Sequence, residues 1–491
     1  MSELLKLSIL EASKKLRSKE IKATELVDSY IKQAKKTKDL NAFSLETFDF
    51  AREEAKKSQE RLDNNTARPL EGIPVAVKDL FCTKGFRTTS CSKMLADFIP
   101  PYDSTVSSKL LGAGGIMIGK TGMDEFAMGS SNGTSYFGGV INPWRAKDNP
   151  DKKLVPGGSS GGSSASVSAF SSMAALGSDT GGSIRQPAAY TATVGIKPSY
   201  GRCSRYGMVA FSSSLDQAGV LARSVADASL VLENVMGHDE FDSTVQNLPV
   251  PQLSKLSANS MKGLKVGVPK EYDHPMLSSD IKASWEKAIS LAKAQGAEIV
   301  EISMPHTSYA LPVYYIIAPA EASSNLSRYD GVRFGYRTTS PITNINDLYE
   351  YTRAEGFGAE VKRRIMIGTF VLSSEHISSY YQKAQRVRTL IIEDFKKAFE
   401  KVDVILTPTT PTPAFGLEDK LDPVSMYMND LFTVPASLAG LPCMSLPIGI
   451  NESGLPLGIQ LIAKHLDEET MIKAALSLEE AISFKLNAYG M

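Results

Sequence analysis

Apolar residues recur at helical spacing near the start of the chain. Over residues 23–34 they fall three and four positions apart, and a second helical, strongly charged segment covers residues 48–62. Acidic and basic residues are interspersed at the same spacing, which is typical of a solvated helix face. We therefore predict an N-terminal helical region over residues 1–65.

Short apolar runs farther along the chain predict strands, and they are mixed with further helical segments. The predicted strands cover residues 74–77, 116–118, 264–268, 298–302, 402–406, 444–446 and 457–462. The predicted helices cover residues 105–111, 163–172, 224–236, 278–295, most of 310–400, and 467–482. The polar, aperiodic residues 239–261 predict a long surface connection. Strands and helices mixed in this way predict an α/β fold with a mixed sheet.

Residues 156–188 are rich in glycine and serine but do not have the composition of a linker. Two glycine-flanked serines, Ser159 and Ser183, lie 24 positions apart, and no charged residue occurs between Leu154 and Ser178. A flexible linker has no reason to carry the alanine, valine, phenylalanine, methionine and leucine found here. We predict a buried core segment whose glycines let the backbone approach another group closely.

Composition and charge narrow the classes of function. Lys plus Arg and Asp plus Glu both number 54, so the net charge is zero, whereas a chain that grips a nucleic-acid backbone alone usually carries a basic excess. Any contact with RNA is therefore expected to be shared with a partner. The four cysteines form no CxxC pair and the five histidines are scattered, which predicts a reducing compartment without disulfide framework or zinc site. We expect neither a signal peptide nor a membrane span, because no run of about 18 apolar residues occurs.

Two familiar motifs match the sequence literally but lack the structural context that they need. Residues 114–121 fit a P-loop, yet a strand predicted at 116–118 leaves no flexible backbone to cradle a phosphate and places Lys120 at the start of a loop. Residues 157–161 fit the GxSxG nucleophile elbow of α/β-hydrolases, which must follow a strand, and the charged residues and proline before it form a poor one. An α/β-hydrolase-type esterase that uses Ser159 and a distant histidine is therefore the weaker alternative.

The second serine directly follows two glycines, and this arrangement favours a nucleophile. The backbone N–H groups of Gly181, Gly182 and Ser183 would converge on one point and hold an oxyanion. A serine that ends such a nest attacks while its own N–H helps to hold the charge. The simpler alternative is a serine that caps a helix after a turn.

A serine nucleophile needs a base, and no histidine is near in the sequence. Lys78 follows the apolar residues 73–77, so burial would lower its pKa and make it a usable base. Ser159, placed between Lys78 and Ser183, would relay the proton. Residue statistics by themselves favour an exposed lysine at a strand end, and the spacing alone does not decide between the two interpretations.

Several segments together resemble the amidase signature family. Its pattern GGSSGGS…GSDTGGSIRxPA…G(L/I)KPTxGR is similar to residues 157–163, 177–188 and 195–202, with Ser199 where many relatives have threonine. The family's upstream lysine strand is similar to residues 74–79. The order and spacing of these segments make the resemblance specific.

This resemblance implies a fold and a set of catalytic roles. The fold would be a central mixed β-sheet covered by helices on both faces, in one domain over residues 1–491, with a mostly helical substrate-side subregion at about 270–400. Ser183 would be the nucleophile, Ser159 the bridging serine on a cis peptide, and Lys78 the base. The oxyanion hole would be formed by the backbone N–H groups of Thr180, Gly181, Gly182 and Ser183.

Further segments narrow the resemblance, namely residues 124–131, 142–144, 328–333, 360–364, 427–430 and 439–447. They make the whole chain most similar to the A subunits of aspartyl/glutamyl-tRNA amidotransferases, which are glutaminases. For such a protein an arginine is suited to a bidentate grip on the α-carboxylate of glutamine. The resemblance points to Arg363 or Arg364 without distinguishing them. Asp430 would pair with the α-ammonium group, and Tyr314 would line the pocket.

The same resemblance implies partners but no cofactor bound by this chain. Ammonia would pass to a kinase-like B subunit, which uses ATP and Mg²⁺ to convert Glu-tRNA(Gln), Asp-tRNA(Asn) or both, and a small C subunit would complete a heterotrimer. The tRNA would be bound mainly through the partner, and no membrane would be involved. The location would be the bacterial cytoplasm or an organellar matrix. A free-standing amidase of the same family that acts on another small amide is the alternative left open.

Overall fold

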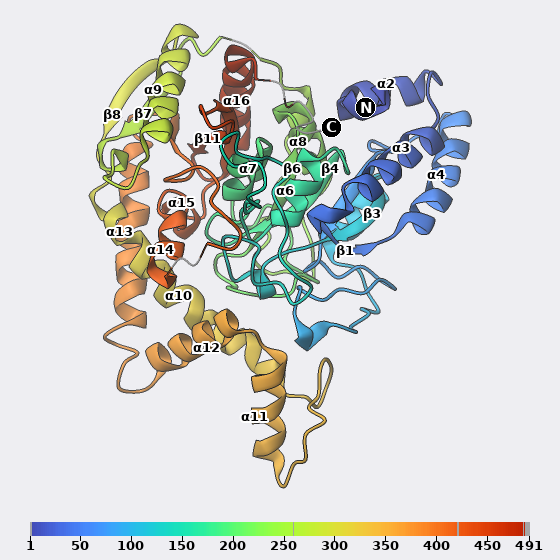
Figure 1. The fold of residues 1–491 in the computed structure, drawn as a ribbon. Helices are drawn as coiled ribbons and strands as arrows, with labels where there is room; N and C mark the ends of the chain where they lie inside the picture. Colours follow the sequence, from blue (N-terminus) through green and yellow to red (C-terminus); the bar gives the residue numbers. More distant parts are fainter. Residues whose placement is uncertain (1, 259, 420–421, 485, 487–491) are drawn as a thin grey trace.

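A single large sheet forms the centre of the molecule (Figure 1). The computed structural model describes residues 2–258, 260–419, 422–484 and 486. In this described part, eleven strands pair in the order β1-β3-β2-β4-β6-β5-β10-β11-β9-β7-β8. The strands are β1 (Phe43–Glu46), β2 (Pro74–Lys78), β3 (Ile116–Thr121), β4 (Ala174–Asp179), β5 (Val194–Lys197), β6 (Gln217–Ala222), β7 (Lys265–Pro269), β8 (Glu298–Ile302), β9 (Val404–Pro408), β10 (Cys443–Ile450) and β11 (Pro456–Ala463).

The sheet is mixed, which confirms the predicted fold class. Strand β2 pairs in parallel with β3 and β4, and β7 pairs in parallel with β8 and β9. The strands between these two parallel groups pair antiparallel, from β4 through β6, β5, β10 and β11 to β9. Parallel neighbours need crossover connections, and helices supply them here.

Helices flank the sheet on both faces. Alternate residues of one strand point to opposite sides of the sheet, so each strand presents side chains to both layers of helices. Ala76 of β2 and Ala175 of β4 pack with Val167 and Ile184, on the side of α6 and the segment leading into α7. The neighbouring Val77 and Leu176 belong to the main core, which also includes Leu232 of α8. The helices are α1 (Glu3–Lys6), α2 (Ile9–Arg17), α3 (Ala23–Lys36), α4 (Phe48–Asp63), α5 (Thr105–Gly112), α6 (Gly161–Ser168), α7 (Arg185–Thr191), α8 (Val225–Glu233), α9 (Ser279–Ala294), α10 (Ala310–Asn325), α11 (Ile345–Gly356), α12 (Ala359–Leu372), α13 (Tyr381–Ala398), α14 (Pro423–Tyr427), α15 (Val434–Leu438) and α16 (Glu468–Ile482).

Side-chain caps explain where several predicted helices begin. The hydroxyls of Ser224 and Ser278 accept hydrogen bonds from backbone N–H groups in the first turns of α8 and α9, and the carboxylate of Asp467 does the same for α16. The predictions at 224–236, 278–295 and 467–482 are thus confirmed to within a few residues.

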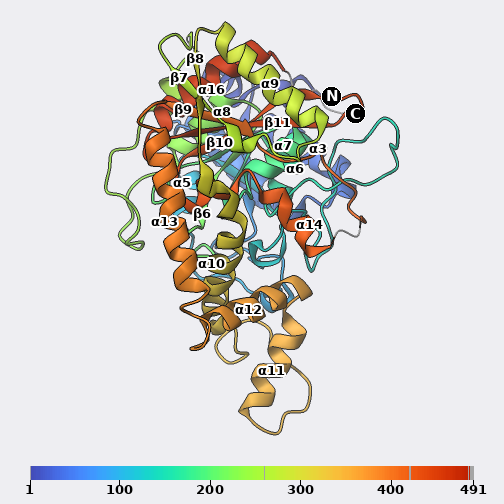
Figure 2. The ribbon, with the colours of Figure 1, turned by 90° about the vertical axis from the view of Figure 1, so that its left-hand side faces the viewer.

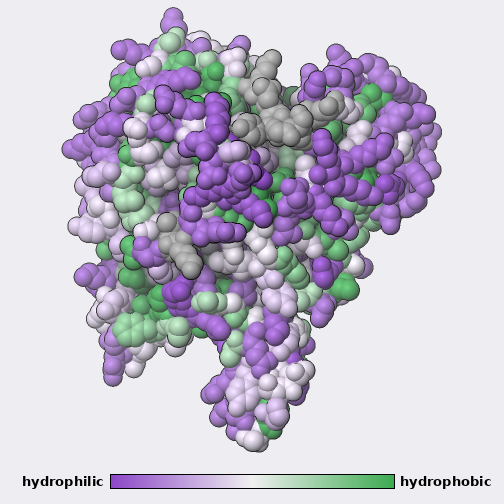
Figure 3. Space-filling model, in the orientation of Figure 1, coloured by the Kyte–Doolittle hydropathy of each residue, from purple (hydrophilic) through white to green (hydrophobic). Residues whose placement is uncertain are grey.

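Helices α10, α12 and α13 pack together beside the sheet, and α11 projects away from the body in both ribbon views (Figures 1 and 2). In the space-filling view the surface over the N-terminal helices is largely hydrophilic (Figure 3), which agrees with the solvated helix faces predicted there. None of the helices in the described ranges combines the length and the apolar character that a bilayer span requires.

The glycine- and serine-rich stretch is buried, as predicted, and its glycines are needed for close packing. A Cβ atom on Gly158 would lie 2.0 Å from Oδ2 of Asp124, and one on Gly162 would lie 2.5 Å from the carbonyl oxygen of Ala42. Every residue of α6 is buried. The predicted helix at 163–172 is misplaced, because the helix begins at Gly161 and ends at Ser168.

Four strands were not predicted, and one loop was predicted wrongly. Strands β1, β4, β5 and β6 are absent from the predicted elements, so the N-terminal region over 1–65 also contains a strand. The segments AALGSD of β4 and QAGVLA of β6 are rich in alanine and glycine, which are depleted in strands. The residue preferences of these two segments therefore did not indicate strands. Lys120 does not start a loop, because β3 continues through it to Thr121.

Candidate active site

Lys78 lies at the end of β2 and is completely buried. Its Nζ atom is 2.7 Å from the hydroxyl of Ser159 and 2.8 Å from the hydroxyls of both Ser160 and Ser178. The interpretation of Lys78 as an exposed strand-end lysine is therefore wrong. Hydroxyl oxygens surround the amine.

Burial lowers the pKa of Lys78 to about 7, because the charged form loses its hydration. The negative charges of Asp124, Asp179 and Asp216 oppose this shift without cancelling it. In the described part of the chain, no carboxylate oxygen lies within 4 Å of Nζ. A substantial fraction of Lys78 is therefore neutral near pH 7 and able to accept a proton.

Ser159 is fully buried and follows a cis peptide bond between Gly158 and Ser159, as the resemblance implied. The residues immediately before it form no strand, so the strand of a nucleophile elbow is missing. Its hydroxyl accepts a hydrogen bond from Lys78, not from a histidine. This geometry argues against the esterase alternative.

Ser183 lies in the short loop that connects β4 to α7. The backbone N–H of Ser160 donates to the carbonyl oxygen of Ser183 over 3.1 Å, which joins the loop to the segment that carries Ser159. Ser183 is 8% exposed, and its hydroxyl has no hydrogen-bond partner in the described ranges. It does not cap α7, because Ile184 occupies the capping position and the carboxylate of Asp179 accepts from the first N–H groups. The helix-cap interpretation is therefore wrong.

The two glycines before Ser183 are required by their neighbours. A Cβ atom on Gly181 would lie 2.7 Å from the ring of Tyr314, and one on Gly182, which has φ +151°, would lie 2.3 Å from Oγ1 of Thr433. No hydrogen bond from the backbone N–H groups of residues 180–183 to another described residue is found. These groups remain available to a bound oxyanion.

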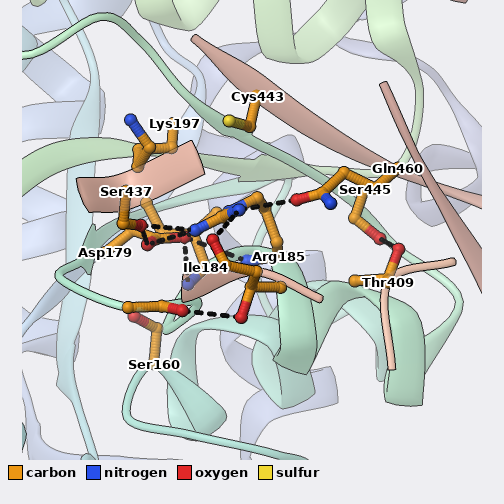
Figure 4. Close-up of polar contacts among 12 residues, drawn as sticks. Ser160, Asp179, Ile184, Arg185, Lys197, Thr409, Ser437, Cys443, Ser445 and Gln460 are labelled. Carbon is orange, nitrogen blue, oxygen red and sulfur yellow. Dashed lines mark hydrogen bonds and ion pairs between the residues drawn. The ribbon is translucent and has the colours of Figure 1, made fainter. Parts of the chain in front are cut away.

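A buried ion pair holds the two ends of this loop together (Figure 4). Nε of Arg185 lies 2.9 Å from Oδ2 of Asp179, and both side chains are fully buried. The guanidinium also donates to the carbonyl of Thr433, to Oε1 of Gln460 and to the hydroxyl of Ser437. Because its donors are satisfied from several elements, Arg185 fixes the loop that presents Ser183. Sequence reasoning missed this pair, although both residues stand in the matched motif.

Arg364 and Asp430 both contact Tyr315. The hydroxyl of Tyr315 donates to Oδ2 of Asp430 over 2.8 Å, and the guanidinium of Arg364 lies 5.4 Å from the centre of the Tyr315 ring. Burial raises the pKa of the Asp430 carboxyl to about 7. Tyr315 and Tyr427 stack on each other and line a cavity of about 410 Å³.

The two candidate arginines differ in burial and in their aromatic contacts. Arg364 is buried among the rings of Phe211, Tyr315 and Tyr427, whereas the side chain of Arg363 is 42% exposed; both pair with Glu360. Tyr315 was missed in the sequence, where only its neighbour Tyr314 was singled out. The sequence signal that could have identified Tyr315 is its position directly after Tyr314.

Within the described ranges, no group of three or more His, Cys, Asp or Glu side chains is arranged to hold a metal ion. The four cysteines are buried and unpaired.

Comparisons with known proteins agree with this arrangement. The family model described as Amidase matches residues 25–472. The A subunit of the glutamyl-tRNA(Gln) amidotransferase of Orientia tsutsugamushi (strain Ikeda) is 57% identical over 487 residues, covering 99% of both chains. The protein of the same name from Rickettsia bellii (strain OSU 85-389) is 56% identical over 484 residues, covering 98% of both. The solved structure of the same protein from Thermotoga maritima is 37% identical, with a TM-score of 0.79, and the match covers 98% of this chain and 96% of that one. The native peptide amidase from Stenotrophomonas maltophilia is 25% identical, with a TM-score of 0.81 and 97% of both chains covered.

Proposed function

The chain belongs to the amidase family, and from this premise we propose that it is the glutamine-hydrolysing component of a tRNA-dependent amidotransferase. The observation that carries the chemistry is a buried amine surrounded by hydroxyls, with Nζ of Lys78 2.7 Å from Oγ of Ser159. The similarity to the A subunits of glutamyl-tRNA(Gln) amidotransferases, over nearly their full length, supports the biological role.

In the proposed mechanism, neutral Lys78 accepts the proton of Ser159 while Ser159 takes the proton of Ser183. The Ser183 oxygen attacks the carboxamide carbon of glutamine, and the resulting oxyanion is held by the backbone N–H groups of residues 180–183. The proton returns from Lys78 through Ser159 to the leaving nitrogen, and ammonia departs. Water then hydrolyses the γ-glutamyl ester on Ser183, with the same groups moving the proton in reverse.

We assign substrate recognition to the residues around Tyr315, namely Tyr314, Arg364 and Asp430. Arg364, rather than the more exposed Arg363, binds the α-carboxylate of glutamine, since a guanidinium grips a carboxylate with two hydrogen bonds. Asp430 pairs with the α-ammonium group, and Tyr314 lines the pocket beside Gly181. An ammonium group bound beside Asp430 would favour the ionised carboxylate and lower its pKa.

The released ammonia is used by a partner. This chain binds no cofactor, and a kinase-like B subunit uses ATP and Mg²⁺ to activate misacylated Glu-tRNA(Gln), Asp-tRNA(Asn) or both, with a small C subunit completing a heterotrimer. The zero net charge of the chain supports a tRNA contact made mainly by the partner. The complex works in a bacterial cytoplasm or an organellar matrix.

Glutamine hydrolysis by single variants of the assembled complex tests the triad. We expect Ser183→Ala and Ser159→Ala to lose nearly all turnover, because members of a triad act as a unit. Ser166→Ala is a matched control, since Ser166 is equally buried and its hydroxyl donates to the carbonyl of Ser163, away from Lys78. Turnover close to that of the unmodified protein in Ser183→Ala would refute the proposed nucleophile.

A free-standing amidase that acts on another small amide is the second candidate, and the structural similarity to a peptide amidase favours it. The two functions differ in their partners and in the group that they recognise. Co-purification of two partner proteins, together with loss of glutaminase activity in Asp430→Ala, would support the amidotransferase role. A chain that purifies alone and hydrolyses other amides faster than glutamine would support the free-standing enzyme.

A further inference from the structure

Thr433 contacts the loop that carries the proposed oxyanion hole. Its hydroxyl donates to the carbonyl oxygen of Gly181 over 2.6 Å, and Thr433 is fully buried. It precedes α15, far from the loop in the sequence, and the same hydroxyl lies 3.2 Å from the carbonyl oxygen of Asp430. A single side chain therefore joins the nucleophile loop to the segment that carries a proposed substrate ligand.

The contact with the Gly181 carbonyl has a direct consequence for the neighbouring N–H. The carbonyl of Gly181 and the N–H of Gly182 belong to one planar peptide unit, and the cis peptide of the described chain lies elsewhere, between Gly158 and Ser159. In a trans unit the carbonyl and the N–H point in opposite directions. The hydrogen bond from Thr433 therefore turns the N–H of Gly182 away from Thr433.

No other hydrogen bond among the described residues orients this peptide unit. Its N–H donates to no described residue. Gly182 has φ +151°, a backbone angle that glycine tolerates and other residues rarely adopt, so the flanking dihedrals place little constraint on the peptide unit. Without the hydrogen bond from Thr433, no hydrogen bond among the described residues would fix the peptide plane between Gly181 and Gly182, although an oxyanion hole depends on donors that are oriented before the reaction.

Thr433 is itself held firmly. Its backbone N–H donates to the carbonyl of Asp430 over 3.2 Å, and its carbonyl accepts from the guanidinium of Arg185 over 2.9 Å. Arg185 is in turn paired with Asp179 at the other end of the same loop. Thr433 is thus connected to the loop twice, through its hydroxyl at Gly181 and through its carbonyl and Arg185 at Asp179. These contacts fix the position of Thr433 relative to the loop.

We propose that Thr433 is a positioning residue that aims the N–H of Gly182 at the oxyanion by holding the carbonyl of Gly181. The inference rests on the proposed function, since it needs Ser183 to be the nucleophile. It adds a residue that touches neither the substrate nor the reacting atoms. Its contribution is made in the transition state and the tetrahedral intermediate, because the negative charge on the oxygen develops there and not in bound glutamine.

Replacing the hydroxyl tests this role. In Thr433→Val the methyl group keeps the shape while the hydrogen bond is lost, and we expect kcat for glutamine hydrolysis by the assembled complex to fall on the order of 10- to 100-fold, below the full loss of an oxyanion donor. KM should change less than about threefold, since ground-state binding is untouched. Thr433→Ser retains the hydroxyl and should recover most of the lost kcat.

Thr47→Val is the matched control, because Thr47 is buried and its hydroxyl donates to the carbonyl of Met117 on β3. It should leave kcat unchanged. A fall in kcat that is equal in Thr433→Val and Thr47→Val, or a loss expressed mainly in KM, would overturn the proposal. So would a Thr433→Ser variant that is no more active than Thr433→Val.

A fluorophosphonate that reacts with activated serines separates failure of this inference from failure of the proposed function. Labelling of the unmodified protein at Ser183, mapped by mass spectrometry and absent in Ser183→Ala, supports the nucleophile, and slower labelling in Thr433→Val supports the positioning role. Normal labelling with equal rates in both proteins would overturn the positioning role alone. Failure of the unmodified protein to label at Ser183 would overturn the proposed function and this inference together.

Discussion

Two buried lysines on neighbouring strands show how surroundings decide what an amine does. Lys78 ends β2, Lys120 lies next to the end of β3, and both are completely hidden from solvent. Because Lys78 aligns with Thr121 and Lys120 aligns with Val77, the two side chains point to opposite faces of the sheet. Their burial is equal, but their partners are not.

Lys120 has the partners of a structural lysine, with an acid among them. Its Nζ donates to the carbonyl of Phe81 over 2.7 Å and to the hydroxyl of Thr88 over 2.8 Å, and a carboxylate oxygen of Asp79 lies 3.8 Å away. Among the described residues, Lys78 has only hydroxyl partners at such short range. A carboxylate favours the ammonium form, whereas hydroxyls compensate burial only weakly. Burial lowers the pKa of Lys120 as well as that of Lys78, but at Lys120 the adjacent Asp79 carboxyl opposes this shift from 3.8 Å away.

The largest effect that would test this comparison is the loss of each lysine in turn. Lys78→Met should lower kcat for glutamine hydrolysis by roughly 10²- to 10⁴-fold, the usual contribution of a general base. Lys120→Met should instead lower the free energy of unfolding by about 3 to 5 kcal/mol, because it leaves the buried Asp79 without its charged partner and the Phe81 carbonyl without its donor. Turnover per folded molecule and chemical denaturation measure the two effects.

The comparison fails if the effects are exchanged. A folded Lys120→Met protein without activity would place Lys120 in the chemistry, and an active Lys78→Met protein would remove Lys78 from it. Stability supplies a further check on Lys78. Because its pKa is lowered in the folded state, its burial costs stability at neutral pH and progressively less as pH rises from about 7 toward the pKa of the unfolded chain.

The pH dependence of activity should follow Lys78 and not Lys120. The base must be neutral, so kcat/KM for glutamine should rise with pH through about 7, the pKa of Lys78, and then level off. A pH–rate profile of the assembled complex checks this. Activity that falls as pH rises from 6 to 8 would contradict a neutral lysine base.

The sequence predicted helices better than the strands that hold the site. Helices α3, α4 and α9 were located because their apolar spacing is regular and long. Strand β4, which leads into the loop that carries Ser183, has the sequence AALGSD and was missed. Its small side chains allow α6 to pack closely against it, so tertiary packing and not intrinsic propensity makes it a strand.

The site could be predicted only in part, for similar reasons. Glycine spacing pointed to the oxyanion nest before Ser183, and the matched motif pointed to the roles of Ser159 and Lys78. The sequence alone could not predict the surroundings of the buried Lys78 amine, because Ser160 and Ser178, which contact this amine, belong to other segments of the chain. Contacts between distant segments, such as Thr433 with Gly181, leave no periodic signal in a single chain.

The smallest effect that would sharpen the comparison is expected at Ser178, which lies 2.8 Å from Nζ of Lys78 through its hydroxyl. A hydrogen bond to an ammonium group is stronger than one to a neutral amine by about 1 kcal/mol, so the hydroxyl favours the protonated form. Ser178→Ala should therefore lower the pKa of Lys78 and move the rising limb of the pH–rate profile to lower pH by somewhat less than about one unit, since one unit corresponds to about 1.4 kcal/mol. The rate at the plateau should change little, and Ser166→Ala should not move the limb. A shift to higher pH would mean that Ser178 donates to the neutral amine, and the hydroxyls around Lys78 would then help to create the base as well as to solvate its charge.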